Sequence, residues 1–276
     1  MRQSPRQLRI LRSAQRQGTV RIGDLAEEMG VSLETIRRDI RPLVEGGTLV
    51  KLHGAVSLTE APFERRLRER ASAKQTIARH VAASIADGDS VMLDTGTTTS
   101  ILARELLTKR GLTIVTNSSD IARTLATVNG NRVYMAGGEL RGDNGAAFGA
   151  SAIAFASSFK VHHAIISIAG VDAEGGLMDQ DLAEAEFARQ VLQCGRRRLV
   201  ITDHSKFNRS ALVRAASFEE IDLLITDRAP PDTLAQRLEE AGTRWEVAGE
   251  PASAASADRE PARRGRLSVE RRAAKS

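Results

Sequence analysis

Six consecutive residues, Asp94-Thr95-Gly96-Thr97-Thr98-Thr99, have the composition of an anion-binding loop. They follow a short apolar run and lead into a helical pattern. A glycine and small hydroxyl residues leave backbone N–H groups accessible, and the N-terminus of a helix favours negative charge. An ordinary capped helix is the alternative, because threonine is a normal helix cap. Three threonines after an aspartate favour phosphate binding.

A second stretch has the pattern of a DNA-reading helix. Leu33, Ile36, Ile40, Leu43 and Val44 form an apolar stripe that could hold such a helix on its domain. The polar residues that could meet DNA lie on this helix and on a hairpin after it: Ser32, Glu34, Thr35, Arg37, Arg38, Arg41, Lys51 and His53.

The arginines of this helix have different expected roles. Arg38 points away from the apolar stripe and could donate two hydrogen bonds to a guanine. Arg37 lies on the flank, where a phosphate is the better partner. The alternative is a charged face that is only solvated, which is the usual fate of such a face.

The elements around this helix predict a winged helix-turn-helix. A first helix starts at Pro5, a second is expected with Asp24 as its N-cap, and Ser32 caps the third. Two short strands follow over residues 48–57. Pro42 lies inside the third helix and predicts a bend near Arg38, because proline removes a backbone hydrogen bond.

The rest of the chain alternates between strands and helices, which predicts an α/β fold with a parallel sheet. Strands are expected at 90–93, 113–116, 132–136, 164–169, 199–202 and 223–226, with helices at 99–107, 120–127, 181–193 and 231–241. Ligands bind beyond the carboxyl ends of such strands. The residues in those positions are Asp94, Asn117, Gly137, Gly138, Gly170, Asp203 and Asp227.

Length and composition narrow the class of protein. A chain of 276 residues with 41% hydrophobic residues suggests two folded domains. It has no apolar run long enough for a membrane span and no secretory signal at its start. Cys194 is the single cysteine and histidines number five, so we expect a cytoplasmic protein without disulfides, metal or cofactor.

The basic charge is concentrated at the two ends of the chain. Residues 1–60 carry a net +3, residues 61–250 carry −2, and residues 251–276 carry +4. We expect a DNA-binding domain at 1–58, a linker and connecting helix at 59–86, and an effector-sensing domain at 87–248. Residues 249–276 have almost no large apolar side chain and are expected to be disordered.

Several motifs occur together in about the first 57 residues: Asp24-Leu25-Ala26, Val31-Ser32, Thr35-Ile36-Arg37-Arg38-Asp39, Leu49-Val50 and His53-Gly54-Ala55. In this combination they resemble the DNA-binding domain of the DeoR family of bacterial repressors. The resemblance implies that the predicted winged helix binds operator DNA.

Further motifs lie between residues 63 and 241: Asp94 to Thr99, Thr116-Asn117, Ala136-Gly137-Gly138-Glu139-Leu140-Arg141, Gly149, Ala169-Gly170-Val171-Asp172, Glu184-Ala185-Glu186 and Asp203-His204-Ser205-Lys206-Phe207. They resemble the sensor domain of the same family, which is similar to ribose-5-phosphate isomerase. This implies a phosphorylated sugar or polyol as effector.

The chemistry of the side chains suggests their roles in such a site. Thr97, Thr98 and Thr99 would hold the phosphate, and Lys206 offers it a compact positive charge. Hydroxyl groups of the effector could be bound by Asp94, Asn117, Asp172 and Asp179, and Arg141 could clamp a pair of oxygens. For each of these residues a structural ion pair or a turn contact is the alternative.

The combined interpretation is a transcriptional repressor that a phosphorylated effector releases from DNA, rather than an enzyme. Several stretches, among them Asp203 to Phe207 followed by Arg209, look most like the glycerol-3-phosphate repressor subgroup. A sugar-phosphate isomerase with an added DNA-binding module is the alternative, with Asp172 or Glu184 as general base. A third possibility is a DNA-compacting or RNA-binding protein that uses the basic tail.

We expect a homodimer or homotetramer, because paired half-sites add affinity to one short reading helix. Effector binding is expected to change the spacing of the two reading heads through the helix at 64–86.

Overall fold

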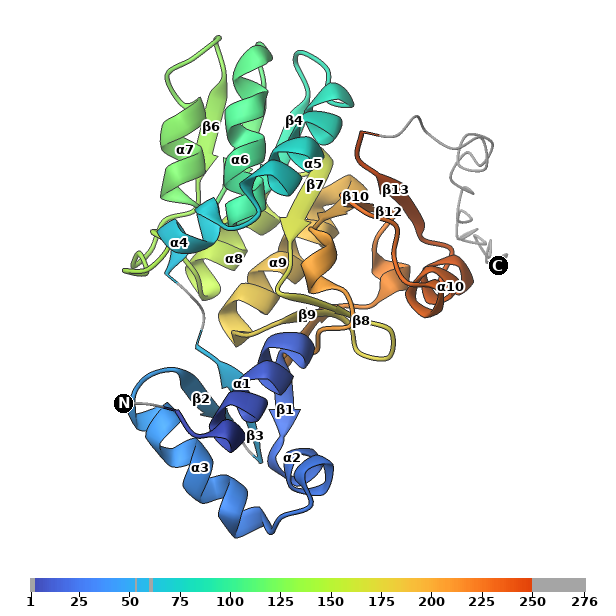
Figure 1. Cartoon of the computed structure of the whole chain (residues 1–276). Coiled ribbons are helices and arrows are strands. Elements are labelled where there is room, and N and C mark those ends of the chain that lie inside the picture. Colours follow the sequence, from blue (N-terminus) through green and yellow to red (C-terminus); the bar gives the residue numbers. More distant parts are fainter. Residues whose placement is uncertain (1–2, 53, 60–61, 250–276) are drawn as a thin grey trace, which may run out of the picture.

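The computed structural model describes residues 3–52, 54–59 and 62–249 (Figure 1). The N-terminal domain contains three helices, α1 (Pro5–Gln17), α2 (Ile22–Met29) and α3 (Leu33–Glu45). A capping box starts α1, in which the Ser4 hydroxyl accepts from the N–H of Gln7 at 3.1 Å. The Ser32 hydroxyl caps α3 by accepting from the N–H of Thr35 at 3.2 Å, as predicted.

Two details of the predicted helices differ in the structure. The cap expected at Asp24 is wrong, because α2 already starts at Ile22 and Asp24 lies in its first turn. There it still faces the positive end of the helix. Leu33 does not belong to the buried stripe: it is 46% exposed at the first position of α3, whereas Ile36, Ile40 and Leu43 are buried. α3 continues through Pro42 as one uninterrupted helix.

The wing is a small antiparallel sheet. It contains β1 (Thr19–Arg21), β2 (Leu49–Leu52) and β3 (Ala55–Leu58) in the order β1-β3-β2. Buried residues of the three helices and of the sheet, including Ile10, Leu25, Ile36 and Val56, form one core. This core holds α3 on the domain with its polar face outward.

The second domain is built on a seven-stranded sheet in which every pairing is parallel. Its strand order is β13-β12-β10-β7-β4-β5-β6. The strands are β4 (Ser90–Leu93), β5 (Thr113–Thr116), β6 (Arg132–Met135), β7 (Val161–Ser167), β10 (Gly195–Ile201), β12 (Leu223–Thr226) and β13 (Arg244–Val247). The predicted parallel α/β fold is therefore confirmed.

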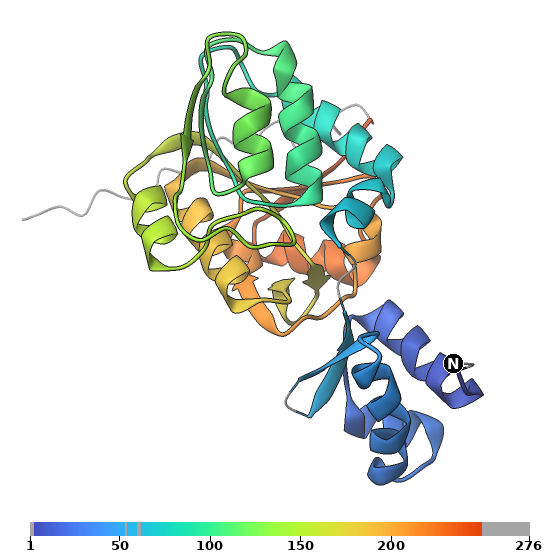
Figure 2. The ribbon, with the colours of Figure 1, turned by 90° about the vertical axis from the view of Figure 1, so that its left-hand side faces the viewer.

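Helices cover both faces of this sheet (Figures 1 and 2). One apolar core joins the sheet to α5 (Ala71–Ala83), α6 (Thr97–Glu105) and α7 (Ser119–Leu125), and a short helix, η1 (Leu106–Thr108), extends α6. The other core joins it to α8 (Ala150–Ser157), α9 (Leu182–Cys194) and α10 (Asp232–Glu240). Strands buried between two layers explain their continuous apolar runs.

A second small sheet, which the sequence pattern did not predict, has the order β11-β9-β8. It consists of β8 (Gly170–Asp172), β9 (Gly176–Asp179) and β11 (Val213–Ala216), all antiparallel. Two further short helices, η2 (His204–Lys206) and η3 (Phe218–Glu220), lie in this part of the chain. Strands of three or four residues are too short for a recognisable alternation.

The connecting segment forms two helices where one was predicted. α4 (Phe63–Arg68) is separated from α5 at Glu69 and Arg70. Arg70 has a left-handed backbone with φ of 52°, which ends one helix before the next begins. None of the helices in the described ranges is long and apolar enough to cross a membrane. The tail that was expected to be disordered lies outside these ranges apart from Gly249.

Candidate functional site

A cavity of about 410 Å³ opens at the carboxyl ends of β4 and β7. These two strands are neighbours in the sheet, and the chain proceeds outward from them in opposite directions, which makes this the switch point where open α/β sheets bind ligands. The cavity is lined by Phe63, Arg66, Glu69, Arg70, Lys74, Thr95, Gly96, Thr97, Thr98, Asn144, Ser167, Ile168, Ala169, Asp179, Glu184, Thr202, Asp203, Ser205, Lys206 and Arg209.

The N-terminus of α6 faces this cavity. Its N-cap is Gly96, which has no side chain to bond the first N–H groups of the helix, so they stay available to an anion. A Cβ atom on Gly96 would overlap the hydroxyl of Ser167, so a larger residue here would have to displace the Ser167 side chain. Within the described ranges the Thr95 hydroxyl is shielded from solvent and has no hydrogen-bond partner. An oxygen-rich ligand could supply that partner.

Basic side chains from two parts of the chain surround the same cavity. Arg66, Arg70 and Lys74 come from α4, α5 and their junction, and Lys206 and Arg209 follow β10. Lys74 is 5% exposed, and its ammonium donates to the carbonyl oxygen of Arg66. Burial lowers the pKa of Lys74 to about 8, although the nearby Asp203 carboxylate opposes the shift. Lys74 is therefore largely charged at neutral pH, at the cost of desolvation.

Asp203 connects the two groups of basic residues. Its carboxylate accepts from the Ser205 N–H at 3.0 Å and lies 3.3 Å from the guanidinium of Arg70. Burial would raise the pKa of Asp203, but the hydrogen bonds from Ser205 and the nearby Lys206 and Arg70 charges hold it below its ordinary value. The carboxylate stays ionised and fixes Arg70 at the edge of the cavity.

Acidic side chains line the same cavity. Asp179 and Glu184 line it, while Asp94 lies behind Ser167 and accepts from that residue's N–H at 3.1 and 3.2 Å. Burial, together with the neighbouring charges of Asp179 and Glu184, holds the pKa of Asp94 well above its ordinary value. The cavity thus presents cations and the N-terminus of a helix together with the carboxyl groups of Glu69, Asp179, Glu184 and Asp203.

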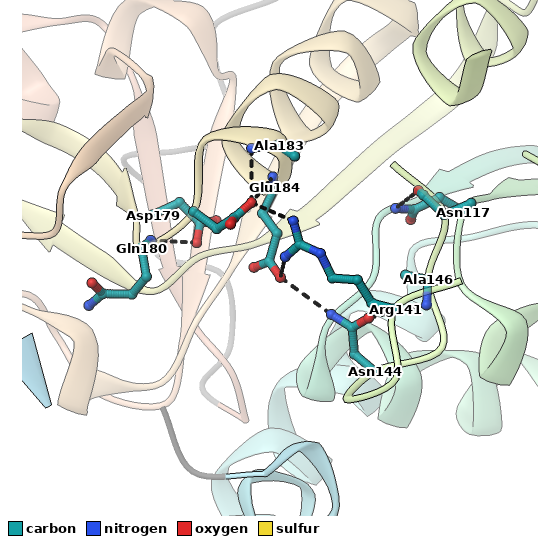
Figure 3. Close-up of polar contacts among 10 residues, drawn as sticks. Asn117, Arg141, Asn144, Ala146, Asp179, Gln180, Ala183 and Glu184 are labelled. Atoms are coloured by element: carbon teal, nitrogen blue, oxygen red, sulfur yellow. Dashed lines mark hydrogen bonds and ion pairs between the residues drawn. The ribbon is translucent and has the colours of Figure 1, made fainter. Parts of the chain in front are cut away.

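Arg141 does not line the cavity itself but pairs with Glu184, which does. Its guanidinium lies 2.7 Å from Asp181 and 3.2 Å from Glu184, and Asn144 donates to the same Glu184 oxygen at 3.3 Å (Figure 3). Asp181 also caps α9 by accepting from the N–H groups of Ala183 and Glu184. This network fixes the Glu184 side chain.

The predicted effector residues fall into two groups in the structure. Those that line the cavity are Gly96, Thr97, Thr98, Asp179, Asp203 and Lys206. The others lie outside its lining: Asp94, Thr99, Asn117, Gly137, Gly138, Arg141, Gly170 and Asp172.

The positions of the second group follow from the sheet. Asn117 follows β5, away from the switch point, and its side chain donates to Ala147 at 3.0 Å. The two glycines follow β6, the edge strand. Asp172 accepts from backbone N–H groups in the β8–β9 turn. The Thr99 hydroxyl donates to the carbonyl of Gly96 at 3.0 Å.

The cations of the connecting helices, Arg66, Arg70 and Lys74, were not among the residues predicted from sequence. One signal was available: Lys74 stands three, four and seven residues before Ile77, Ala78 and Val81, all of which are buried. A lysine at a position of a helix that is otherwise apolar is unusual, because a buried lysine needs a partner for its charge, and such a lysine therefore indicates a candidate site residue. Arg70 gave no such signal, because only the break between α4 and α5 turns it towards Asp203.

The polar face of α3 is open to solvent. Ser32, Glu34, Arg37, Arg38 and Arg41 are exposed, Thr35 is half-buried, and Lys51 is exposed on the wing. Arg41 pairs with Glu45 at 2.9 Å on the helix surface. His53 lies outside the described residues. The predicted DNA-facing residues of α3 are therefore accessible to solvent, and three of them are arginines.

A winged helix with an exposed polar helix face, followed by a parallel α/β domain with a charged cavity, defines a ligand-responsive DNA-binding regulator. The chain belongs to the DeoR family. The DeoR-like helix-turn-helix domain matches residues 6–61, and the DeoR C terminal sensor domain matches residues 69–228.

Relatives with similar identity carry different names. The glycerol-3-phosphate regulon repressor of Escherichia coli is 35% identical over 242 residues, 86% of this chain and 96% of the relative. The transcriptional repressor AccR of Agrobacterium fabrum is 34% identical over 84% of this chain and 94% of its own length.

Among solved structures, ribose 5 phosphate isomerase A from Neisseria gonorrhoeae aligns with a TM-score of 0.35 and 14% identity, over 49% of this chain and 52% of that one. This TM-score is too low to support any inference about activity. The fold of the second domain is defined by the strand order given above.

Proposed function

We propose that this protein is a transcriptional repressor of sugar or glycerol catabolism genes, which a phosphorylated sugar or polyol releases from operator DNA. Its relatives include proteins named as transcriptional repressors. The observation that carries the proposal is the cavity, because it joins the N-terminus of α6, which has no side-chain cap, to Lys74 and Lys206 in a chain that also presents α3.

The two kinds of charged group in the cavity define the class of effector. A phosphate monoester is a dianion near neutral pH, and it fits the helix N-terminus and the two lysines. Hydroxyl groups then face Asp179 and Glu184, whose carboxylates accept hydrogen bonds. Glycerol 3-phosphate heads the list of effectors on the name of one relative.

A calorimetric and thermal-shift panel tests the effector. Glycerol 3-phosphate and several pentose and hexose phosphates are compared with glycerol, with the free sugars and with inorganic phosphate. We expect binding of at least one phosphorylated compound and much weaker binding of its unphosphorylated partner. A panel in which the free sugars bind as well as their phosphates would exclude the phosphate site.

The same panel tests the alternative of an isomerase. Turnover of a pentose phosphate would identify an enzyme, whereas binding without turnover supports a sensor. Asp172 is a poor general base in this geometry, because its carboxylate accepts from the N–H groups of Glu174 and Gly175.

We further propose that the protein acts in the cytoplasm as a homodimer or homotetramer on paired operator half-sites. One short reading helix makes few base contacts, and a second copy on the same duplex raises the affinity. Light scattering of the protein alone and on its operator measures the number of copies. A monomer that binds a single half-site with full affinity would exclude this arrangement.

A further inference from the structure

The turn after α1 is joined to the sensor domain by backbone hydrogen bonds. The N–H of Thr19 donates to the carbonyl of Ser210 at 3.2 Å, and the N–H of Ser210 donates to the carbonyl of Gln17 at 3.0 Å. Between them Gly18 has φ of 79°, and a Cβ atom there would overlap the carbonyl oxygen of Ser210. Glycine is therefore required both by the backbone conformation and by the contact.

Ser210 ends a segment that also forms the cavity. Lys206 and Arg209 of this segment line the cavity. The segment lies along β8, where the N–H of Arg209 donates to Val171 at 3.4 Å and Gly170 leaves room for the carbonyl of Arg209. One stretch of five residues, 206–210, thus contributes two cations to the cavity and ends in the residue that bonds to the DNA-binding domain.

A second contact between the domains lies beside this bridge. The Ser57 hydroxyl of β3 lies 3.3 Å from the carbonyl of Gly18 and 3.5 Å from the side-chain oxygen of Gln180. Gln180 directly follows Asp179, whose carboxylate lines the cavity and accepts the Gln180 N–H at 2.8 Å. Two segments of the cavity lining, one with Arg209 and one with Asp179, therefore lie next to residues that contact the Gly18 turn or its neighbour Ser57.

The turn is in its own right coupled to the reading helix. It ends α1, and near its other end α1 is fixed to α3, because the Gln7 side chain donates to the carbonyl of Asp39 at 3.1 Å and Arg6 pairs with the Asp39 carboxylate. A displacement of the α1–β1 turn is passed to α3 as a movement of a rigid helix.

We propose that residues 206–210 transmit effector binding to the DNA-binding domain through the backbone bridge between Ser210 and the Gly18 turn. This inference rests on the proposed effector site. A ligand that engages Lys206 and Arg209 shifts the segment, and the bridge moves the turn, α1 and α3 with it. The route expected from sequence runs through the helix at 64–86 instead, so the two routes make different predictions.

The decisive variant is Gly18→Ala, with Gly47→Ala as its matched control. Gly47 lies in the same domain, also has a positive φ of 68° and has open space around it, so alanine there strains the backbone without touching the sensor domain. Both variants are tested as full-length protein. The duplex is one selected by the wild-type protein from random sequence, and the probe is the phosphorylated compound that binds best in the panel.

The measured quantity is the ratio of duplex affinities without and with saturating probe. We expect a ratio of at least about fivefold for the wild type and for Gly47→Ala, and of less than about twofold for Gly18→Ala. Calorimetry should show that Gly18→Ala still binds the probe. A Gly18→Ala protein that keeps the full ratio would overturn the inference.

A measurement on the wild type covers the case in which Gly18→Ala is unstable. Hydrogen exchange of the Thr19 and Ser210 amides reports the bridge directly, because both N–H groups donate across it. We expect the probe to change the exchange of both amides. Unchanged exchange, in a protein that binds probe and releases DNA, would also overturn the inference, whereas absence of probe binding would refute the proposed sensor function itself.

Discussion

Lys74 shows how one residue can be central to a site and still look structural in sequence. It occupies an apolar register position of α5, yet its ammonium reaches the cavity beside Lys206 and Asp203. Burial is the larger effect and lowers the pKa of Lys74 to about 8. An anionic ligand would relieve this, because a negative charge nearby favours the charged form.

The pH dependence of effector binding tests this role of Lys74. The bound state holds the Lys74 proton more tightly than the free state, so affinity falls as pH rises through about 8. We expect affinity to be steady between pH 7 and 7.5 and to fall by up to about tenfold per pH unit above 8. Calorimetry in buffers of different ionisation enthalpy measures the proton uptake directly.

Lys74→Met should remove this dependence and weaken binding about ten- to a hundredfold at pH 7, since it removes a charged hydrogen-bond donor. Lys160→Met is the control, because Lys160 is exposed, donates to the Gln193 carbonyl at 2.8 Å and lies outside the cavity lining. Equal affinities of Lys74→Met and the wild type would place the anion elsewhere.

The arginines of α3 give a second prediction at the scale of residues. Arg38→Ala should cost about 1–3 kcal/mol on the selected duplex and little on a random duplex, because a base contact is lost. Arg37→Ala should weaken binding to both duplexes alike, since a phosphate contact carries no sequence information. Fluorescence anisotropy on the two duplexes measures these losses. Equal losses for Arg38→Ala on both would count against base reading.

At the scale of elements, α3 and α6 use opposite devices at their N-termini. Ser32 caps α3 with its hydroxyl, so the helix end needs no external partner. Gly96 leaves α6 without a side-chain cap, and the open N–H groups face the cavity.

Pro42 makes α3 a testable element. The residue is exposed in the last turns of the helix and has no N–H to donate to the carbonyl of Arg38. Pro42→Ala should restore that hydrogen bond and raise the free energy of unfolding of the N-terminal domain, by up to about 3 kcal/mol. Pro42→Gly should give about 1 kcal/mol less than alanine.

Thermal unfolding of the three proteins, followed by calorimetry, gives this order of stability. A Pro42→Ala protein that is less stable than the wild type would mean that the domain relies on the geometry that proline imposes. Affinity for the selected duplex, measured in parallel, shows whether Arg38 needs that geometry for its contact.

At the scale of the whole molecule, charge is distributed by function. The first 60 residues carry +3 and the last 26 carry +4, while the segment between them, which holds the proposed anion site, carries −2. The affinity of that site for an anion therefore comes from local groups, among them Lys74, Lys206 and the N-terminus of α6. Overall charge contributes to DNA attraction instead.

Deletion of residues 251–276 tests the contribution of the basic tail. Removal of +4 should weaken binding to random DNA and make its salt dependence shallower, because fewer counterions are released. Discrimination between selected and random duplexes should not fall. Titrations at several salt concentrations measure both quantities. Loss of all DNA binding would mean that the winged helix is not the reader.

The sequence alone determined the class of protein and six of the seven strands of the parallel sheet, β13 being the exception. Local patterns carry that information: the apolar stripe of α3 follows a period of 3.6 residues, and the runs of β4, β5 and β12 match the structure residue for residue. The loop before α6, predicted to bind an anion, does line the cavity, and its composition could be recognised because it is local.

Only the tertiary structure decided which of the predicted residues share a site. Residues follow every strand of the sheet, but the cavity forms at β4 and β7, where the chain changes direction, so Asn117 after β5 falls outside its lining. The tertiary structure also places Arg70, Lys74 and Arg209 at the cavity and Ser210 beside Gly18. Such contacts join segments far apart in the chain, and their geometry depends on how the layers pack rather than on local pattern.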